Sequence, residues 1–260
     1  QHHHAHVAAV LAEHEPEEPI LGVAWDGTGL GDDGTIWGGE FLLCEGGGYE
    51  RTAWLDPFPL VGGDAAAREP RRSALGLLHA LDRPVDFPHG LSNNEVTLLQ
   101  QALKQGINTV MTSSIGRLFD GVAALLGLRQ LTAFEGQSAM ALEFAAAGKL
   151  GLPYPFELND SIDWRPMVKA IIDDHDRGMA VGEISTRFHG TLVEWLVAVA
   201  QRIGVRQVVL SGGCFQNRLL WEGGAERLEE AGFEVLLPRH LPVNDGAIAA
   251  GQAWVARGGN

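Results

Sequence analysis

The chain has 260 residues, 45% of them apolar, so it can bury the core of one large domain or of two packed lobes. Its 33 acidic residues outnumber its 19 basic ones, and the resulting net charge of −14 argues against binding to nucleic acid or to an anionic membrane surface. Cys44 and Cys214 are too few for a disulfide framework, and no segment approaches the roughly 20 apolar residues of a membrane span. The composition therefore predicts a soluble protein of the reducing cytoplasm.

The first part of the chain predicts a short helix and then a three-stranded meander. Helical spacing at 7–14 ends at the Glu-Pro-Glu-Glu-Pro segment. Apolar or alternating runs separated by Gly-rich turns predict strands at 20–25, 35–44 and 49–55. Helical spacing with Ser and Asn caps then returns at 70–81, 93–105, 116–126 and 137–147. The middle of the chain is therefore predicted to be a helical insertion.

The last part of the chain has the pattern of an α/β lobe. A polar, proline-containing passage at 152–165 predicts a boundary between an N-terminal lobe, residues 1–160, and a C-terminal α/β lobe, residues 161–260. The elements predicted after it are helices at 166–174 and 181–202, a strand at 207–210, a helix at 215–231, a strand at 233–237 and a helix at 246–256.

The chain opens on a histidine cluster, Gln1-His2-His3-His4-Ala5-His6, in which His2 and His6 stand four residues apart and so share one face of a helix. That spacing suits two imidazoles on one metal ion. Because two imidazoles leave a divalent cation under-coordinated and uncompensated in charge, carboxylates should come from elsewhere in the fold. Asp26, at a strand end, and Asp245, in the turn before a helix, are the candidates.

The competing interpretation of this cluster is a tag remnant or a solvated tail. Five histidines outside the cluster are predicted to be ordinary surface or core residues: His14, His79, His89, His175 and His240.

A Gly-rich segment, Asp26-Gly27-Thr28-Gly29-Leu30-Gly31, directly follows the first predicted strand. Glycines at a strand end let backbone N–H groups approach phosphate oxygens closely, which favours a ligand-binding loop. A plain hairpin turn is the alternative, because Asp32-Asp33-Gly34 comes next.

A second Gly-rich segment, Ser211-Gly212-Gly213-Cys214-Phe215-Gln216-Asn217, predicts a tight turn between a strand and a helix. The unpaired N–H groups at such a helix N-terminus favour an anion such as a nucleotide phosphate. Asn217 offers both a donor and an acceptor to a ribose or a phosphate. A purely structural turn is the alternative, since the segment is neither GxGxxG nor a P-loop. Cys214 has no identifiable companion base, so it is not expected to be a nucleophile.

A third polar segment begins at Ser114, which is placed to cap the helix predicted at 116–126. Arg117 and Asp120, in the first turns of that helix, project either into a cleft or into water. The sequence leaves these two alternatives open.

Taken together, these segments resemble the C-terminal domain of HypF-type carbamoyltransferases, which act in hydrogenase maturation. The matching stretches keep the family's order over nearly the whole chain, and they are residues 1–6, 26–40, 112–120, Glu135-Gly136-Gln137, 211–217 and Asn244-Asp245-Gly246. The resemblance implies an actin/Hsp70/sugar-kinase-like (ribonuclease H-like) α/β fold, with two lobes around a nucleotide cleft. It further implies that the first strands of the N-terminal lobe are missing, which would leave a sheet edge unpaired.

The resemblance also implies which residues form the site. One divalent metal ion, iron or zinc, is expected on His2, His6, Asp26 and Asp245, with His2, His6 and Asp245 as the catalytic residues. ATP or carbamoyl adenylate is expected to contact Gly27, Gly29, Asp120 near the ribose, Gly136, and Gly213 with Asn217.

The reaction implied is transfer of a carbamoyl group from carbamoyl adenylate to the C-terminal cysteine of a HypE-like acceptor protein, with release of AMP. That group later becomes the cyanide ligand of the nickel–iron site. In complete family members a YrdC-like domain makes the adenylate, and this domain is expected to be a further partner because its sequence is not in the chain. The chain, which opens at Gln1 rather than Met, is therefore expected to be a domain cut from a longer polypeptide.

Three alternatives remain open. An O-carbamoyltransferase acting on a small-molecule hydroxyl would use the same metal and nucleotide groups. A tRNA threonylcarbamoyl transferase is disfavoured by residues 32–40, which follow the HypF pattern, and by the acidic composition. A non-catalytic nucleotide-binding scaffold would keep the fold without the reaction.

Overall fold

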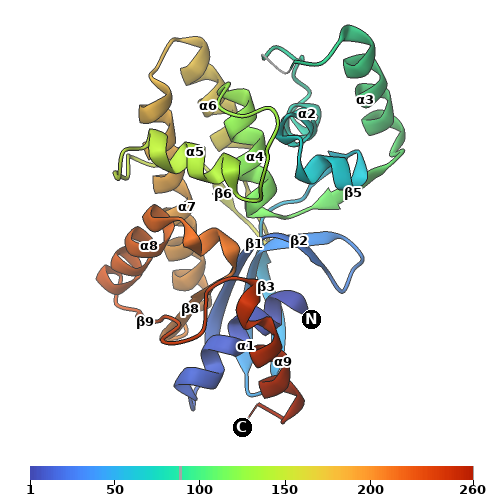
Figure 1. Cartoon of the computed structure of the whole chain (residues 1–260). Coiled ribbons are helices and arrows are strands. Elements are labelled where there is room, and N and C mark those ends of the chain that lie inside the picture. The colour runs from blue at the N-terminus through green and yellow to red at the C-terminus, as the bar shows by residue number, and fades with distance from the viewer. Residues whose placement is uncertain (88–89, 260) are drawn as a thin grey trace.

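The computed structural model describes residues 1–87 and 90–259, which form a mixed β-sheet and the helices packed on it (Figure 1). The helices are α1 (His2–His14), α2 (Pro70–Ala80), α3 (Asn93–Gln105), α4 (Ile115–Leu125), α5 (Gln137–Ala145), α6 (Arg165–Asp176), α7 (Val181–Ile203), α8 (Arg218–Glu230) and α9 (Ile248–Ala256). The 3-10 helices are η1 (Gly63–Ala67), η2 (Gly213–Gln216) and η3 (Asp245–Ala247). The strands are β1 (Ile20–Leu30), β2 (Ile36–Glu45), β3 (Gly48–Trp54), β4 (Phe58–Val61), β5 (Thr109–Thr112), β6 (Glu157–Leu158), β7 (Ile162–Asp163), β8 (Gln207–Ser211) and β9 (Glu234–Leu236). The predicted α/β class is confirmed.

The larger sheet has the strand order β4-β5-β2-β1-β8-β9, with β3 paired to β2 outside this path. Strands β1, β2 and β3 pair antiparallel in sequence order, so the predicted meander is confirmed. Strand β1 also pairs parallel with β8, and β8 pairs parallel with β9. The sheet thus crosses the boundary predicted near residue 160, and the division into two lobes stays a prediction.

Both faces of the sheet are buried at β1, because the apolar residues of this strand alternate between two cores. Leu21, Val23 and Trp25 face the larger core, which contains the inner sides of α2, α4, α6 and α7. Ile20 and Ala24 face a smaller core formed with α1, β2, β8 and β9. In Figure 1, α9 lies beside α1 at the lower end of the molecule, where both termini are also found.

Helix ends follow local side-chain chemistry. Ser92 forms a capping box with Glu95 at the start of α3, and the side chains of Ser114 and Asn217 cap α4 and α8. The helix predicted at 215–231 is divided, because Asn217 has extended backbone angles (φ −69°, ψ 117°) that separate η2 from α8. Helix α1 begins five residues before the predicted start, where the side chain of Gln1 accepts a hydrogen bond from the His4 N–H (2.8 Å).

The four helices predicted in the middle of the chain are present as α2, α3, α4 and α5, but two short strands, β4 and β5, were not predicted. Strands β4 and β5 pair antiparallel, and β5 joins β2 through the Ile36–Thr112 pair. Each strand has four residues, too few for a clear alternation of apolar and polar side chains. Pro59 further weakens the strand pattern of β4, since proline cannot donate to a sheet ladder.

The prediction of a turn or loop at Asp26 also needs correction, because β1 continues through this residue to Leu30. Its register against β2 shifts between Trp25 and Gly29, as in a β-bulge. A bulge locally redirects the side chains of a strand. The Gly-rich segment is therefore an irregular strand, and the hairpin turn follows it, with Gly34 N–H donating to the Gly31 carbonyl (3.1 Å).

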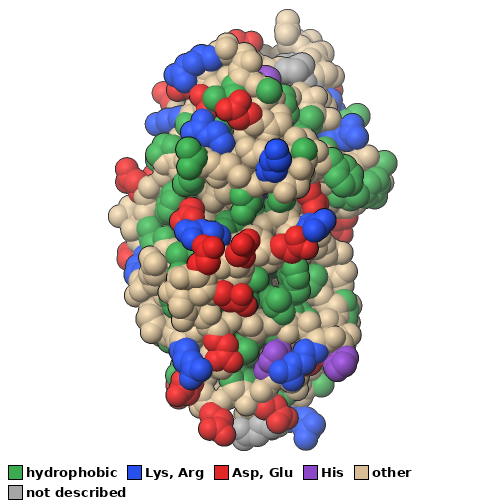
Figure 2. Space-filling model, turned by 90° about the vertical axis from the view of Figure 1, so that its left-hand side faces the viewer, with side chains coloured by type: hydrophobic (Ala, Val, Ile, Leu, Met, Phe, Trp, Pro, Cys, Tyr) green, Lys and Arg blue, Asp and Glu red, His purple; other side chains and the backbone are tan. Residues whose placement is uncertain are grey.

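Carboxylates spread over the height of the face drawn in Figure 2, with arginine and lysine side chains between them. This distribution agrees with the net charge of −14. Within residues 1–87 and 90–259, no helix combines the length and apolarity that crossing a membrane requires.

Candidate metal and nucleotide site

The structure brings together the four residues chosen as metal ligands. One donor atom from each of His2, His6, Asp26 and Asp245 lies within 4.8 Å of the other three. Asp26 Oδ2 is 3.0 Å from His2 Nε2 and 3.1 Å from His6 Nε2, and Asp245 Oδ1 is 3.3 Å from His6 Nε2. Two neutral imidazoles and two carboxylates match the charge and the ligand preference of a divalent cation of the iron or zinc type. These four residues therefore fit the predicted ion.

The two imidazoles are positioned by α1, as their spacing predicts. His2 and His6 lie on one face of the helix with ring centroids 4.9 Å apart. His3, His4 and His6 are each at most 3% exposed, so the interpretation of this cluster as a solvated tail is wrong. Burial lowers the pKa of His3 to about 3 and that of His4 to about 4, so both are neutral at pH 7.

Gly29 leaves the space that the histidine rings occupy. A Cβ at this position would lie 2.5 Å from His3 Cε1 and 2.7 Å from His2 Cδ2, closer than any side-chain carbon tolerates. The strand β1 and the first turn of α1 can approach each other only because this residue has no side chain. Gly29 therefore shapes the metal end of the site and does not line the cavity beside it.

Asp26 carries its negative charge inside the protein. Burial would raise the pKa of its carboxyl group, but the hydrogen bonds with His2 and His6 outweigh that effect and hold the pKa well below its usual range. The hydrogen bond with Asp26 raises the pKa of His2, against the opposing effect of burial. The charges of these groups are thus coupled, as expected of ligands that share one ion.

Asp245 reaches the histidines from the far end of the chain. The Asn244 side chain accepts from the Gly246 N–H (3.1 Å), and the Gly212 N–H donates to the Val243 carbonyl (2.9 Å). These bonds hold the segment before α9 against the Gly-Gly turn. The turn itself is held beside Asp26, because the ring of Phe215 stacks on that of Trp25 with centroids 5.5 Å apart.

A cavity of about 340 Å³ opens directly beside these ligands. The residues that line it are Asp26, Gly27, Gly116, Arg117, Asp120, Glu135, Gly136, Ala139, Gly213, Cys214, Gln216, Asn244 and Asp245. Four of the predicted nucleotide contacts, Gly27, Asp120, Gly136 and Gly213, are among them. Burial raises the pKa of Cys214 well above its usual range, so this thiol stays protonated at neutral pH, as expected of a residue that is not a nucleophile.

Asn217, a further predicted nucleotide contact, turns its side chain away from the cavity. Its Oδ1 accepts from the N–H groups of Leu219 and Leu220 (3.0 and 3.3 Å), and its Nδ2 lies 3.0 Å from His189 Nε2. The side chain is 6% exposed. In this structure Asn217 fixes the start of α8, as an N-cap residue does.

His189 is a buried neutral histidine, and it makes stability depend on pH. Its Nδ1–H donates to the Ser185 carbonyl (2.8 Å), so Nε2 accepts from Asn217. Burial lowers its pKa to about 4, below the ordinary value of 6.5, so its contribution to stability is complete above about pH 6.5 and is lost as the pH falls toward 4. We expect this one group to cost about 2 kcal/mol of unfolding free energy between pH 7.5 and pH 5.

Urea unfolding of the wild type and of His189→Gln at these two pH values tests this expectation. Glutamine can still donate to Ser185 and accept from Asn217, but it does not titrate. The variant should therefore lose less stability on acidification than the wild type. An equal loss in the two proteins would show that His189 does not cause the acid sensitivity.

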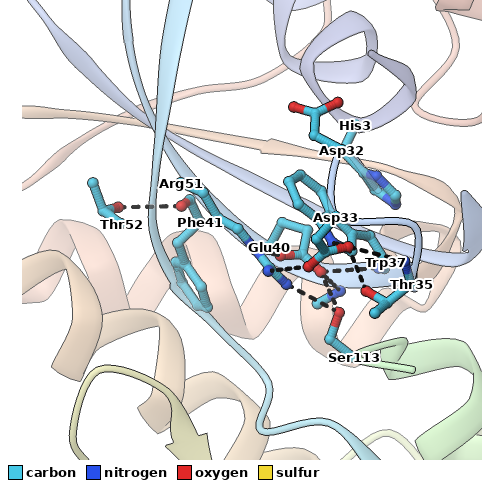
Figure 3. A network of polar contacts seen from close by, with 12 residues as sticks. His3, Asp32, Asp33, Thr35, Trp37, Glu40, Phe41, Arg51, Thr52 and Ser113 are labelled. Carbon is cyan, nitrogen blue, oxygen red and sulfur yellow. Dashed lines mark hydrogen bonds and ion pairs between the residues drawn. The ribbon is translucent and has the colours of Figure 1, made fainter. Parts of the chain in front are cut away.

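A second network of polar groups joins β2 and β3 to Ser113 and lies next to His3 of the histidine cluster (Figure 3). The Glu40 side chain has no exposed surface, and it accepts from Ser113 Oγ (2.5 Å), from Arg51 Nε (2.6 Å) and from the Gly38 and Gly39 N–H groups. Arg51 lies over the ring of Trp37, 4.0 Å from its centroid. The Trp37 ring in turn lies against His3, with centroids 6.0 Å apart. The network therefore fixes the hairpin that borders the first turn of α1.

Sequence reasoning left some of these residues without a role. The sequence does not decide whether the Arg117 side chain points into a cleft or into water, and the structure places it in the cavity wall. Glu135, Gln216 and Asn244 also line the cavity, although they were noted only as parts of motifs. Glu40 was noted only as the last residue of one matching stretch, and nothing in a single glutamate within a strand predicts complete burial. His89 lies outside the described residues.

The model of a protein family described as "Carbamoyltransferase, Kae1-like Domain, second subdomain" matches residues 22–252. The chain belongs to the HypF carbamoyltransferase family. The carbamoyltransferase HypF of Synechocystis is 44% identical over 97% of the chain, and HypF2 of Cupriavidus necator is 40% identical over 98% of it. The chain spans 36% of the length of each of these relatives.

Solved HypF structures have the same fold. A crystal structure of full-length HypF in the phosphate- and nucleotide-bound form superposes with a TM-score of 0.90 at 38% identity, covering 98% of the chain and 35% of the HypF chain. The crystal structure of T. kodakarensis HypF superposes with a TM-score of 0.85 at 30% identity. The match covers 98% of this chain and 36% of that HypF chain. The finer assignment to the actin/Hsp70/sugar-kinase group stays a prediction.

In this HypF domain, removal of the Asp245 carboxylate is expected to weaken metal binding without unfolding the protein. The side chain is 71% exposed, so Asp245→Ala should change the unfolding free energy by no more than about 0.5 kcal/mol. The same change should lower the affinity for a divalent cation by about 10- to 100-fold or more, so that purified protein no longer retains it. Metal content by mass spectrometry, with the exposed Asp160→Ala as a charge-matched control, measures the effect. Unchanged metal content in Asp245→Ala would remove this residue from the site.

Proposed function

We propose that this domain transfers a carbamoyl group from carbamoyl adenylate to the C-terminal cysteine of a HypE-like protein, in the synthesis of the cyanide ligands of nickel–iron hydrogenases. The observation that carries the proposal is the direct contact between the cluster of His2, His6, Asp26 and Asp245 and a cavity bordered by the Gly-Gly turn. A metal site next to a place for an acyl phosphate is what activation of a mixed anhydride requires. Membership of the carbamoyltransferase family supports the same chemistry.

The proposed reaction is a displacement at the carbamoyl carbon. The thiolate sulfur of the acceptor forms a bond to this carbon, the bond from the carbon to the phosphate oxygen breaks, and AMP leaves with the electron pair. A divalent cation on the four ligands would act as a Lewis acid toward the carbonyl or phosphate oxygen. The acceptor protein brings the nucleophile in this proposal, because Cys214 of this chain is a half-buried thiol with a raised pKa.

The remaining cavity residues orient the nucleotide in this proposal. Backbone groups of Gly27, Gly136 and Gly213 can approach the adenylate closely, since no side chain stands between them and the cavity. Asp120, a buried residue of α4 in the cavity wall, accepts from a ribose hydroxyl in this proposal. These groups hold the anhydride in position while the acceptor approaches, which lowers the entropic part of the barrier.

Two partners of this domain, one further domain and one acceptor protein, enter as proposals. The HypF of Synechocystis and HypF2 of Cupriavidus necator are each nearly three times as long as the part that the chain matches, which leaves room in them for other domains. We propose that a YrdC-like domain supplies carbamoyl adenylate to this one. The acceptor protein would then meet the nucleotide at the mouth of the cavity.

Supplying preformed carbamoyl adenylate and a HypE-like protein to the metal-loaded domain tests the proposed reaction. Mass spectrometry of the acceptor should show one carbamoyl group on its C-terminal cysteine. His2→Ala/His6→Ala is the control, because a scaffold that merely binds nucleotide would show no difference between the two proteins. Carbamoylation of a small-molecule hydroxyl in place of the protein would favour an O-carbamoyltransferase.

A further inference from the structure

The cavity beside the metal ligands has an unbalanced charge. Its walls contain four carboxylates, from Asp26, Asp120, Glu135 and Asp245. Among the described residues that line it, Arg117 is the one arginine or lysine. An anionic ligand would be repelled by such a surface unless cationic groups meet it directly.

The backbone of Arg117 is tied to the edge of the metal cluster. Arg117 lies in the first turn of α4, where its N–H donates to the Ser114 Oγ (3.1 Å). The same hydroxyl lies 2.8 Å from the Asp26 carbonyl oxygen and 2.7 Å from that of Gly27. The start of α4 is thus anchored to the bulged part of β1 that presents Asp26. The N-terminal end of this helix also adds a positive electrostatic potential at the cavity.

The guanidinium of Arg117 is buried without a full set of hydrogen bonds. The residue is 6% exposed, and its Nε and Nη1 have no hydrogen-bond partner among the described residues. Nη1 lies 3.0 Å from Asp120 Oδ2, which itself accepts no hydrogen bond there. The contact is therefore an ion pair without a hydrogen bond, and N–H groups of the guanidinium remain without an acceptor. Buried donors in this condition favour a ligand that accepts from them.

The geometry points to Arg117 as the residue that binds the phosphate of the nucleotide, an inference that rests on the proposed function and names a further positioning group for it. Two N–H groups of a planar guanidinium match two oxygens of a phosphate, which a lysine ammonium cannot do. The ion pair with Asp120 keeps the guanidinium in place, and the N–H groups without a hydrogen-bond partner belong to a residue that lines the cavity. In the reaction, the same contact stabilises the negative charge that accumulates on the phosphate as AMP departs.

Two ligands that differ in the phosphate alone, AMP and adenosine, test this inference by calorimetry on the protein with its retained metal. We expect Arg117→Gln to weaken AMP binding by about 10- to 100-fold, since charge-assisted hydrogen bonds are lost. Adenosine binding should stay the same, which also shows that the variant is folded. Arg117→Lys should fall between the wild type and Arg117→Gln for AMP. The control is Arg218→Gln, which removes an exposed arginine of α8 that is paired with Glu222 and should leave both affinities unchanged.

The other outcomes are distinguishable. Equal AMP affinity in the wild type and Arg117→Gln would overturn the assignment while leaving the proposed function in place. Equal losses for AMP and adenosine would mean that Arg117 merely supports the fold of the cavity, which also overturns it. If the wild type bound neither ligand, the proposed use of an adenylate would fail together with this inference.

Discussion

Purified protein is expected to retain about one divalent cation per chain, and His2→Ala/His6→Ala is expected to lose it. Each imidazole places its Nε2 within 3.1 Å of Asp26 Oδ2, so the double change removes half of the donor set and leaves two carboxylates close together. Replacing outer groups that only orient metal ligands costs about 10- to 100-fold in affinity, so losing two ligands should cost at least about 100-fold. Metal analysis by mass spectrometry after dialysis, together with a zinc or iron titration, measures the change.

A second double variant, His79→Ala/His175→Ala, removes the same number of imidazoles at positions outside the cluster. It should retain metal as the wild type does. Retention of a full equivalent by His2→Ala/His6→Ala would contradict the assignment of the ligands. Circular dichroism of each variant checks that the loss does not come from unfolding, since His6 is fully buried.

Gly251→Val is expected to destabilise the protein and to weaken its metal binding at the same time. Gly251 lies where α9 crosses α1, and a Cβ there would come within 1.9 Å of the Ala5 carbonyl oxygen. The neighbour is backbone, so α9 must move away from α1. Overpacking of this kind costs about 3 kcal/mol or more when backbone has to shift. Because α9 follows Asp245 directly and α1 presents His2 and His6, their separation also disperses the ligands.

Urea unfolding and a metal titration of this variant give the two measurements. Ala253→Val is the control on the same helix, since it also introduces a valine but at an exposed position. It should cost no more than about 0.7 kcal/mol, the difference in helix propensity. A Gly251→Val protein with normal stability would show that the two helices do not pack as closely as the structure has them.

Sequence patterns predicted most of the elements, because long helices and buried strands carry strong periodicity. The helix predicted at 93–105 has the same first and last residues as α3. Both ends have a clear local signal, because a capping box starts the helix and Gly106, in the left-handed conformation, ends it. Strands β4 and β5 could not be predicted, because four residues hold too little alternation and the pairing partner of β5 is distant in sequence. Tertiary pairing, not local propensity, makes these residues strands.

The candidate metal ligands could be chosen from the sequence for a chemical reason. The spacing of His2 and His6 predicts that both imidazoles lie on one face of a helix. Carboxylates are expected beside them because they balance the charge of a divalent cation. The proximity of Asp245 to residue 2 depends on the packing of α9 against α1, which no local pattern contains. For Asn217 the sequence motif suggests a nucleotide contact that the side chain does not offer. Its Oδ1 caps α8, and its Nδ2 lies next to His189 Nε2. Its side-chain direction depends on a buried neighbour 28 residues away.

The ligand cluster joins residues 2 and 6 to residue 245, which has a consequence for synthesis on the ribosome. Until residue 245 has been synthesised and α9 has packed on α1, the nascent chain can present the imidazoles and Asp26 but lacks the fourth donor. Closing so long a loop is entropically costly until the intervening sheet has formed, so the ion should be captured tightly only after the residues of this domain have folded together. An incompletely translated chain would therefore not sequester metal in the cell.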